Sequence, residues 1–363
     1  MKRIVTFGEI MGRLAPPGFL RFRQALPGSL DVTFAGAEAN VAASLAMLGV
    51  NADFVTALPD HDIADACIGS VRNMGVGTDH IVRGDGRLGL YFLETGANQR
   101  PSRVTYDRAG SSISVTPSSA YNWNETLKGA TWFHTTGITP AISQVAFESA
   151  LDAARIAKAQ GSTVSCDLNF RKKLWRWDPS CEPRELAGET MRQLLPYVDV
   201  VIANEEDCHD VLGIQAEDSD VESGSLNVSR YPDVARKVVQ QFPNVSRVAI
   251  TLRESISASH NNWGGMLFDA ATDTAFFAPV GANGEYAPYE IRNIVDRVGG
   301  GDSFGAGLIF ASTTDELSDP ESSIRFAVAA SCLAHSISGD FNFSTRAEVE
   351  ALMKGSGSGR VVR

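Results

Sequence analysis

The stretch VDRVGGGDSFGAGLIFAS, residues 295–312, is the most informative part of this sequence. Three consecutive glycines lead into Asp302, and the small and apolar residues that follow have the period of a buried helix. Residues 291–298 can form the end of a strand, so the glycines are predicted to lie at a strand-to-helix junction. The first N–H groups of a helix have no partner within the helix. The junction therefore predicts a binding site for an anion.

Asp302 has a simpler explanation, because an aspartate at the start of a helix often caps it. Three adjacent glycines weigh against capping alone, since each one increases the entropy lost on folding. The common nucleotide fingerprints do not fit: GxGxxG would need a glycine where Phe304 stands, and a P-loop would need GK[ST]. A carboxylate beside a phosphate repels it unless a metal intervenes or the carboxylate acts as a base toward a substrate hydroxyl. The second role is favoured for Asp302.

Composition limits the class of protein. The chain has 363 residues, 44% of them hydrophobic and 21% charged, which is enough to bury a large core. The net charge is −11 and the pI about 5.1, so neither a nucleic-acid nor a membrane partner is predicted, because both need a basic surface. The five cysteines are scattered without a CxxC motif, which is typical of reduced thiols. With no apolar run of membrane-spanning length, a cytoplasmic location is expected.

Strand-like and helix-like segments alternate along most of the chain. Strands are predicted at 3–9, 52–59, 162–170 and 246–252, helices at 37–49, 63–75, 303–312 and 322–337, and a strand running into a helix at 198–207. This alternation is typical of a mostly parallel sheet with helices on both faces. The fold class predicted is α/β, with one domain over residues 1–363.

Two regions break the alternation. Residues 12–35 and 86–115 lack helical periodicity and contain strand-like stretches such as LGLYFLE and SRVTYD. They are predicted to form a small accessory sheet, a lid over the active site. The acidic and serine-rich stretch 214–231 is predicted to be a surface excursion.

The motifs at the two ends of the chain resemble those of one family. VDRVGGGDSFGAG (295–307) is similar to the C-terminal signature of the ribokinase-like (PfkB-type) carbohydrate kinases, and FAGAEANVAASLAMLG (34–49) to their N-terminal signature. FGEIMGRLAPP before the N-terminal signature, and GLYFLE, QRPSRVTYDRAGS and SCDLNFRKKLW between the two signatures, resemble the members that phosphorylate 2-keto-3-deoxygluconate. The resemblance implies a ribokinase-like three-layer α/β/α core with a small β-sheet lid, ATP and Mg²⁺, a sugar-acid substrate, and a homo-oligomer formed through the lid. Some members are also activated by a monovalent cation.

The resemblance also implies roles for the opening motif. Asp302 matches the base that deprotonates the sugar-acid hydroxyl, and the turn of Gly299, Gly300 and Gly301 matches the anion hole for the transferred phosphoryl group. Phosphoryl transfer depends mainly on positioning and charge stabilisation, so the chemistry inferred from the residues agrees with the family's.

A sugar acid carries a carboxylate. The planar guanidinium of arginine, which can donate two parallel hydrogen bonds, binds a carboxylate better than the ammonium of lysine does. By similarity, the residues that match substrate-contacting positions are Gly36, Asn40, Tyr91, Tyr106, Arg108 and Arg171. For the two tyrosines, which lie in predicted strands, packing is the alternative role.

The remaining matches concern the nucleotide and the metal. IANEED (202–207) resembles the family's N-x-x-E motif and implies that Asn204 and Asp207 help to place Mg²⁺ through water. Asp207 replaces the usual glutamate, and helix capping would equally explain both residue types. In TLRESISASHNN (251–262), Arg253 stands where many relatives have lysine, and Thr251 and Arg253 are candidates for phosphate contacts together with Gly299 and Gly301.

Three alternatives stay open from the sequence. Another sugar kinase of the same family, such as a fructokinase or a kinase for the galactonate epimer, would have the same motifs. A nucleotide- or sugar-binding regulator without catalysis would also bind these ligands, although Asp302 and its glycines are intact. A dehydrogenase is the most distant alternative, because its glycine fingerprint is missing.

Overall fold

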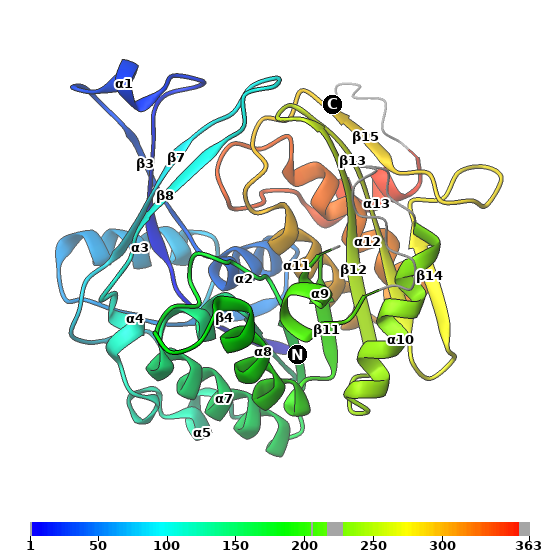
Figure 1. Cartoon of the computed structure of the whole chain (residues 1–363), viewed down its shortest axis with the longest axis horizontal. Helices are drawn as coiled ribbons and strands as arrows, with labels where there is room; N and C mark the ends of the chain where they lie inside the picture. Colours follow the sequence, from blue (N-terminus) through cyan, green and yellow to red (C-terminus); the bar gives the residue numbers. More distant parts are fainter. Residues whose placement is uncertain (1, 205, 216–227, 356–363) are drawn as a thin grey trace.

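The structure is a computed structural model that describes residues 2–204, 206–215 and 228–355. Its main sheet has nine strands, and eight of them lie in the order β14-β13-β12-β11-β10-β9-β1-β4, with β15 paired to β13. The run from β4 to β12 is parallel, and the strands beyond β12 are antiparallel. The predicted mostly parallel sheet is therefore confirmed (Figure 1).

The strands of the main sheet have the following bounds: β1 (Arg3–Phe7), β4 (Asn51–Val55), β9 (Trp132–Thr136), β10 (Thr163–Asp167), β11 (Val200–Ala203), β12 (Arg247–Ser257), β13 (His260–Asp269), β14 (Thr274–Ala278) and β15 (Tyr289–Arg292). A two-stranded parallel sheet joins β5 (Ala57–Leu58) to β6 (Val82–Arg83). The predicted strand 52–59 is thus two strands, and the strand predicted at 246–252 continues to Ser257.

The main sheet is covered on both faces by the longer of the helices whose bounds follow, whereas α1 (Phe22–Ala25) lies away from the main sheet. Their bounds are α1 (Phe22–Ala25), α2 (Ala37–Met47), α3 (Asp62–Asn73), α4 (Ser112–Val115), α5 (Trp123–Thr126), α6 (Ile138–Ile142), α7 (Gln144–Ala159), α8 (Pro183–Leu194), α9 (Asp207–Leu212), α10 (Tyr231–Gln241), α11 (Gly300–Ser312), α12 (Pro320–Ala334) and α13 (Arg346–Met353). Within the described ranges, none of them has the length and apolar character needed to cross a membrane.

Side chains alternate between two hydrophobic cores along each central strand. Val5 packs in one core with α7, α8 and α10, whereas Ile4 packs in the other with α2, α3, α11 and α12. Val201 and Val200 divide between the same two cores. Because successive strand residues point to opposite faces, an uninterrupted apolar strand needs cover on both sides. The three layers of the fold follow from this pattern.

The two regions without helical periodicity do form a second sheet. Its strands, in the order β3-β2-β7-β8, are β2 (Met11–Ala15), β3 (Asp31–Ala35), β7 (Gly89–Glu94) and β8 (Arg103–Asp107). Figure 1 shows this sheet standing out from one edge of the core. Two short helices, α1 and α4, also lie in these regions, where only strands were expected. The predicted excursion at 214–231 falls mostly outside the described residues.

The prediction for residues 291–298 is wrong in part. Strand β15 ends at Arg292, so a loop of seven residues, not a strand end, leads into the helix at Gly300. The loop forms because Asp296 accepts hydrogen bonds from its neighbours, the N–H groups of Arg297 (2.8 Å) and Val298 (3.2 Å), in place of a neighbouring strand.

Candidate active site

One cavity of about 370 Å³ collects every residue that the sequence nominated for binding or catalysis. It lies at the carboxyl end of the parallel strands, where Asp167 ends β10, Ala203 ends β11 and Glu9 follows β1. Ligands of open α/β sheets bind at this edge. The second sheet supplies another part of the wall, including Tyr91 of β7 and Tyr106 of β8.

The three glycines of the turn differ in the space around them. Gly299 caps α11 with a φ of 82°, and a Cβ there would lie 2.3 Å from the carbonyl oxygen of Asp340. A Cβ on Gly300 would lie 3.1 Å from the ring of His335. A Cβ on Gly301 would meet nothing within 4 Å, although Gly301 lines the cavity. Packing explains the first glycine, while the third keeps the helix N-terminus open to a ligand.

Asp302 does not cap the helix. Gly299 is the N-cap, and Asp302 lies in the first turn, where its carboxylate accepts a hydrogen bond of 2.7 Å from the Asn40 side chain. Asn40 is itself oriented by the Gly36 N–H, which donates to its Oδ1 (3.3 Å). Burial raises the pKa of Asp302 to about 6, helped by the charge of Asp340 and opposed by the Asn40 hydrogen bond and by Arg171. Such a carboxylate is ionised at neutral pH and can still accept a proton.

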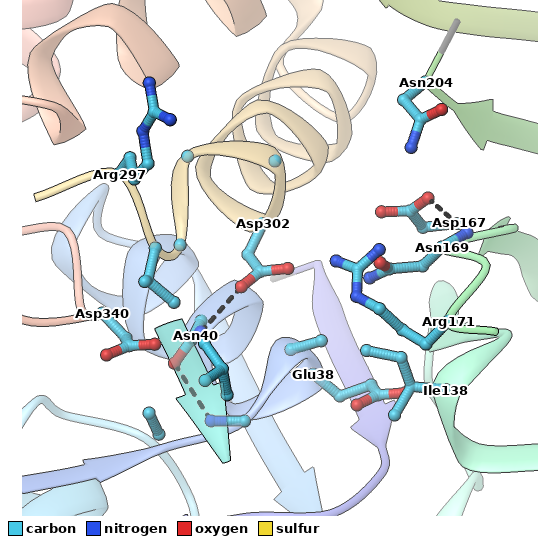
Figure 2. A pocket seen from close by; sticks show the side chains of 18 of the residues that line it. Glu38, Asn40, Ile138, Asp167, Asn169, Arg171, Asn204, Arg297, Asp302 and Asp340 are labelled. Atoms are coloured by element: carbon cyan, nitrogen blue, oxygen red, sulfur yellow. Dashed lines mark hydrogen bonds between the residues drawn. The ribbon is translucent and has the colours of Figure 1, made fainter. Parts of the chain in front are cut away.

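Arg171 follows β10 in the sequence DLNFR and faces the same space as Asp302 (Figure 2). The loop turns sharply because Asn169 has a φ of 40° and donates its N–H to the Asp167 carboxylate (3.2 Å). Burial, followed by the charges of Asp207 and Asp302, raises the pKa of Asp167 well above its usual value, and Arg171 opposes this rise. One guanidinium, of Arg171, and three carboxylates therefore share this part of the cavity.

Arg108 is buried and forms an ion pair with Glu9, a residue that the sequence did not nominate. Its guanidinium also lies 5.4 Å from the centre of the Tyr106 ring. In this conformation the charge of Arg108 is already compensated, so a substrate carboxylate would have to share it with Glu9. The predicted contact between Arg108 and the substrate stays a prediction.

Tyr91 is buried, and its hydroxyl donates to the carboxylate of Asp340 at 2.9 Å. Asp340 also binds Arg13, whose other nitrogen binds Asp296, each at 2.5 Å. Burial, and next the charge of Asp340, raise the pKa of Tyr91 well above its usual value. Tyr91 thus belongs to a buried polar network that joins the second sheet to the loops around the glycine turn.

Asn204 and Asp207 hydrogen-bond to backbone N–H groups at the start of α9, as expected for the alternative role near a helix N-terminus. The Asn204 side chain accepts the N–H groups of Glu206 (2.8 Å) and Asp207 (3.0 Å). Asp207 accepts the N–H groups of Asn204 and Phe170, both at 3.0 Å. In the described part of the chain, no cluster of three or more metal-binding side chains is found. The roles of Asn204 and Asp207 toward Mg²⁺ stay a prediction.

The sequence missed several residues of the cavity. Some stand next to a nominated motif and could have been found there, namely Glu9, Glu38, Asp167, Asn169 and Arg297. Glu38 accepts hydrogen bonds from Thr136 and Thr139, and burial raises its pKa to about 7. His335 and Asp340 also line the cavity, but they lie in segments whose sequence has no recognisable binding or catalytic motif.

An α/β core that directs a carboxylate and a helix N-terminus into one cavity is typical of an enzyme that transfers a phosphoryl group to a hydroxyl. The chain belongs to the pfkB family of carbohydrate kinases, whose model matches residues 1–251. The glycine turn lies beyond the matched residues, so its assignment rests on its own sequence and geometry.

Similar proteins cover nearly the whole chain. The 2-dehydro-3-deoxygalactonokinase of Haloferax volcanii is 30% identical over 98% of both chains. 2-Dehydro-3-deoxygluconokinase from Thermotoga maritima, known from a crystal structure, is 46% identical in sequence. The two structures superpose with a TM-score of 0.87, and the match covers 98% of this chain and 100% of that one. A fructokinase from Xylella fastidiosa with bound ATP, 22% identical with a TM-score of 0.75 over 98% and 99%, shares the fold. The predicted ribokinase-like fold is confirmed.

Proposed function

We propose that this carbohydrate kinase transfers the γ-phosphoryl group of ATP to the terminal hydroxyl of 2-keto-3-deoxygluconate, giving the 6-phospho product. The observation that carries the proposal is the placement of Asp302 and Arg171 in one cavity at the N-terminus of α11. A base and a carboxylate-binding guanidinium are the two groups that a sugar-acid acceptor needs. The similarity to the Thermotoga maritima enzyme supports the choice of sugar acid.

In the proposed mechanism Asp302 removes the proton of the hydroxyl while its oxygen attacks the γ-phosphorus, and the bond to ADP breaks. The N–H groups of the Gly299–Gly301 turn stabilise the charge on the transferred group. Mg²⁺ supplies charge neutralisation on the phosphates. Asn204 and Asp207 would hold Mg²⁺ through water, because their side-chain oxygens already accept backbone N–H groups.

The second sheet supports two further proposals. It lines the cavity with Met11, Tyr91 and Tyr106, so its closure over the sugar would exclude water. It and the loop beside it also expose Phe19, Leu20 and Val32, with 56%, 41% and 59% of each residue accessible. A second copy of the chain would cover these side chains, which supports a homo-oligomer through the lid, and light scattering by the purified protein tests it.

A substrate panel tests the proposed function. ADP release is measured with MgATP and 2-keto-3-deoxygluconate, its galactonate epimer, fructose, ribose and gluconate. Turnover confined to the ketodeoxy sugar acids is expected. The similarity to the Haloferax volcanii enzyme makes the galactonate epimer the second candidate. Preference for a neutral sugar would overturn the substrate and leave the kinase family standing, and no turnover with any sugar would favour a regulator.

Replacing Arg171 by alanine is expected to raise the KM for the sugar acid by about tenfold to a hundredfold, since a hydrogen bond to a charged group contributes about 1.5–3 kcal/mol. Arg176→Ala is the matched control, because Arg176 is exposed and does not line the cavity. Steady-state kinetics with each variant measure the effect. An unchanged KM in Arg171→Ala would contradict a carboxylate contact at this residue.

The pKa of Asp302 predicts how kcat/KM depends on pH. The ionised carboxylate is the base, so kcat/KM should fall tenfold for each pH unit below about pH 6. The Asn40 hydrogen bond lowers this pKa, and Asn40→Ala should therefore move the acidic limb to higher pH. Asn51→Ala, the same substitution at an exposed residue of β4 outside the cavity, is the control. A limb that stays in place or moves to lower pH in Asn40→Ala would refute this assignment.

A further inference from the structure

We propose that Arg297 binds the phosphates of the nucleotide, together with Arg253 and the glycine turn. The inference rests on the proposed function in one respect, that the phosphoryl donor is a nucleoside triphosphate. Arg297 lies two residues before Gly299 and lines the cavity, and the sequence did not nominate it. Its position makes it a second guanidinium for an anion, separate from the one that faces the sugar acid.

Arg297 is held in place by two parts of the fold. Its backbone N–H donates to the Asp296 carboxylate, which fixes the loop before the glycine turn. Its Nη2 donates to the Asn261 side chain (2.8 Å) and to the carbonyl oxygen of Ser257 (3.2 Å), both on the β12–β13 hairpin. These contacts use part of the donor capacity of the guanidinium, and its Nε has no acceptor in the structure. An arginine restrained in this way can bind an anion with little loss of side-chain entropy.

The charges around Arg297 favour an anion. Burial, and next the charge of Arg253, lower the pKa of Arg297, so the two guanidinium groups repel one another in the absence of a ligand. His335 lines the same region, and burial first and then both arginines lower its pKa. The N-terminus of α11 adds its own partial positive charge at Gly299–Gly301. A polyanion would relieve the repulsion between the two guanidinium groups.

Arg171 and Arg297 lie in different parts of the cavity, so each would bind a different substrate. Figure 2 shows Arg297 and Arg171 on different sides of Asp302, with Arg297 beside the start of α11. The sugar-acid carboxylate would lie toward Arg171, and the phosphate chain would lie toward Arg297 and the glycine turn. Asp302 stands between them, where a base must meet the hydroxyl and the γ-phosphorus in line.

The test compares Arg297→Gln and Arg297→Lys with Arg292→Gln, an exposed arginine of β15 outside the cavity. Glutamine can keep a hydrogen bond to Ser257 or Asn261. For Arg297→Gln, the KM for ATP and the Kd for inorganic tripolyphosphate should both rise by about tenfold to a hundredfold, while the KM for the sugar is unchanged. Arg297→Lys should restore part of the affinity, and Arg292→Gln should behave as the wild type.

Thermal unfolding separates a phosphate contact from a structural role. Because Arg297→Gln removes repulsion from Arg253, the ligand-free Tm should stay the same or rise, while the increase in Tm caused by ATP should shrink. A lower ligand-free Tm with an unchanged response to ATP and tripolyphosphate would overturn the proposal. If the wild type binds ATP but phosphorylates no sugar, the proposed function fails, and the binding of tripolyphosphate still decides the role of Arg297.

Discussion

Asp302→Asn is expected to lower kcat by about 10²–10⁴-fold, the contribution of a positioned general base. Asparagine has the shape of aspartate, and its side-chain oxygen can still accept the hydrogen bond from Asn40. Because it cannot take up a proton, the loss should appear in kcat and much less in either KM. Coupled ADP release at saturating MgATP and sugar acid measures the effect, and the thermal response to ATP verifies that the variant still binds its substrates.

Asp319→Asn is the matched control for this variant. Asp319 is the N-cap of α12, where its side chain accepts the Ser322 N–H at 2.9 Å, and it lies outside the cavity. Asparagine caps helices as well as aspartate does, so kcat and Tm should both be preserved. If Asp302→Asn retained kcat within a few-fold of the wild type, Asp302 would have only a structural role and another group would have to remove the proton.

Arg13→Met is expected to produce the largest loss of stability, about 3–5 kcal/mol. Arg13 and its two partners, Asp296 and Asp340, are each less than 10% exposed, and both contacts measure 2.5 Å. The two charges nearby raise the pKa of Arg13 well above its usual value despite its burial. Methionine fills much of the same volume but leaves two buried carboxylates without their cation. The midpoint of thermal unfolding should fall by several degrees.

An exposed ion pair provides the comparison for Arg13. Arg346 pairs with Glu350 one turn further along α13, and the Arg346 side chain is 44% exposed. Arg346→Met should cost less than about 1 kcal/mol, because solvent screens the pair. In the Arg13→Met background, Asp340→Asn should recover part of the lost stability by removing one buried charge. Equal and small effects of Arg13→Met and Arg346→Met would show that the buried network contributes little.

The sequence predicts the core elements well and their ends less well. The alternation of apolar residues that places Ile4 and Val5 in opposite cores is local information, and so is the glycine turn. The loop before α11 could not be predicted, because IRNIVDRV contains the β-branched isoleucines and valines that are typical of a strand. It leaves the sheet at Arg292 since Asp296 is engaged by its own neighbours and by Arg13.

The candidate site also has features that the sequence predicts and features that it does not. Residue types and motifs nominated a set of side chains that the fold does bring to one cavity, because the carboxyl ends of parallel strands meet at one edge of a sheet. The sequence did not predict which residues these side chains contact. Arg108 meets Glu9, and Arg13 meets Asp296 and Asp340, which lie 283 and 327 residues away. The sequence alone was enough to predict the α/β fold class and the glycine turn at the start of α11, because periodicity and motifs are local features, and the chemistry of that turn stays a prediction. Which carboxylate each arginine binds could be learned only from the folded chain, since it depends on how distant segments pack.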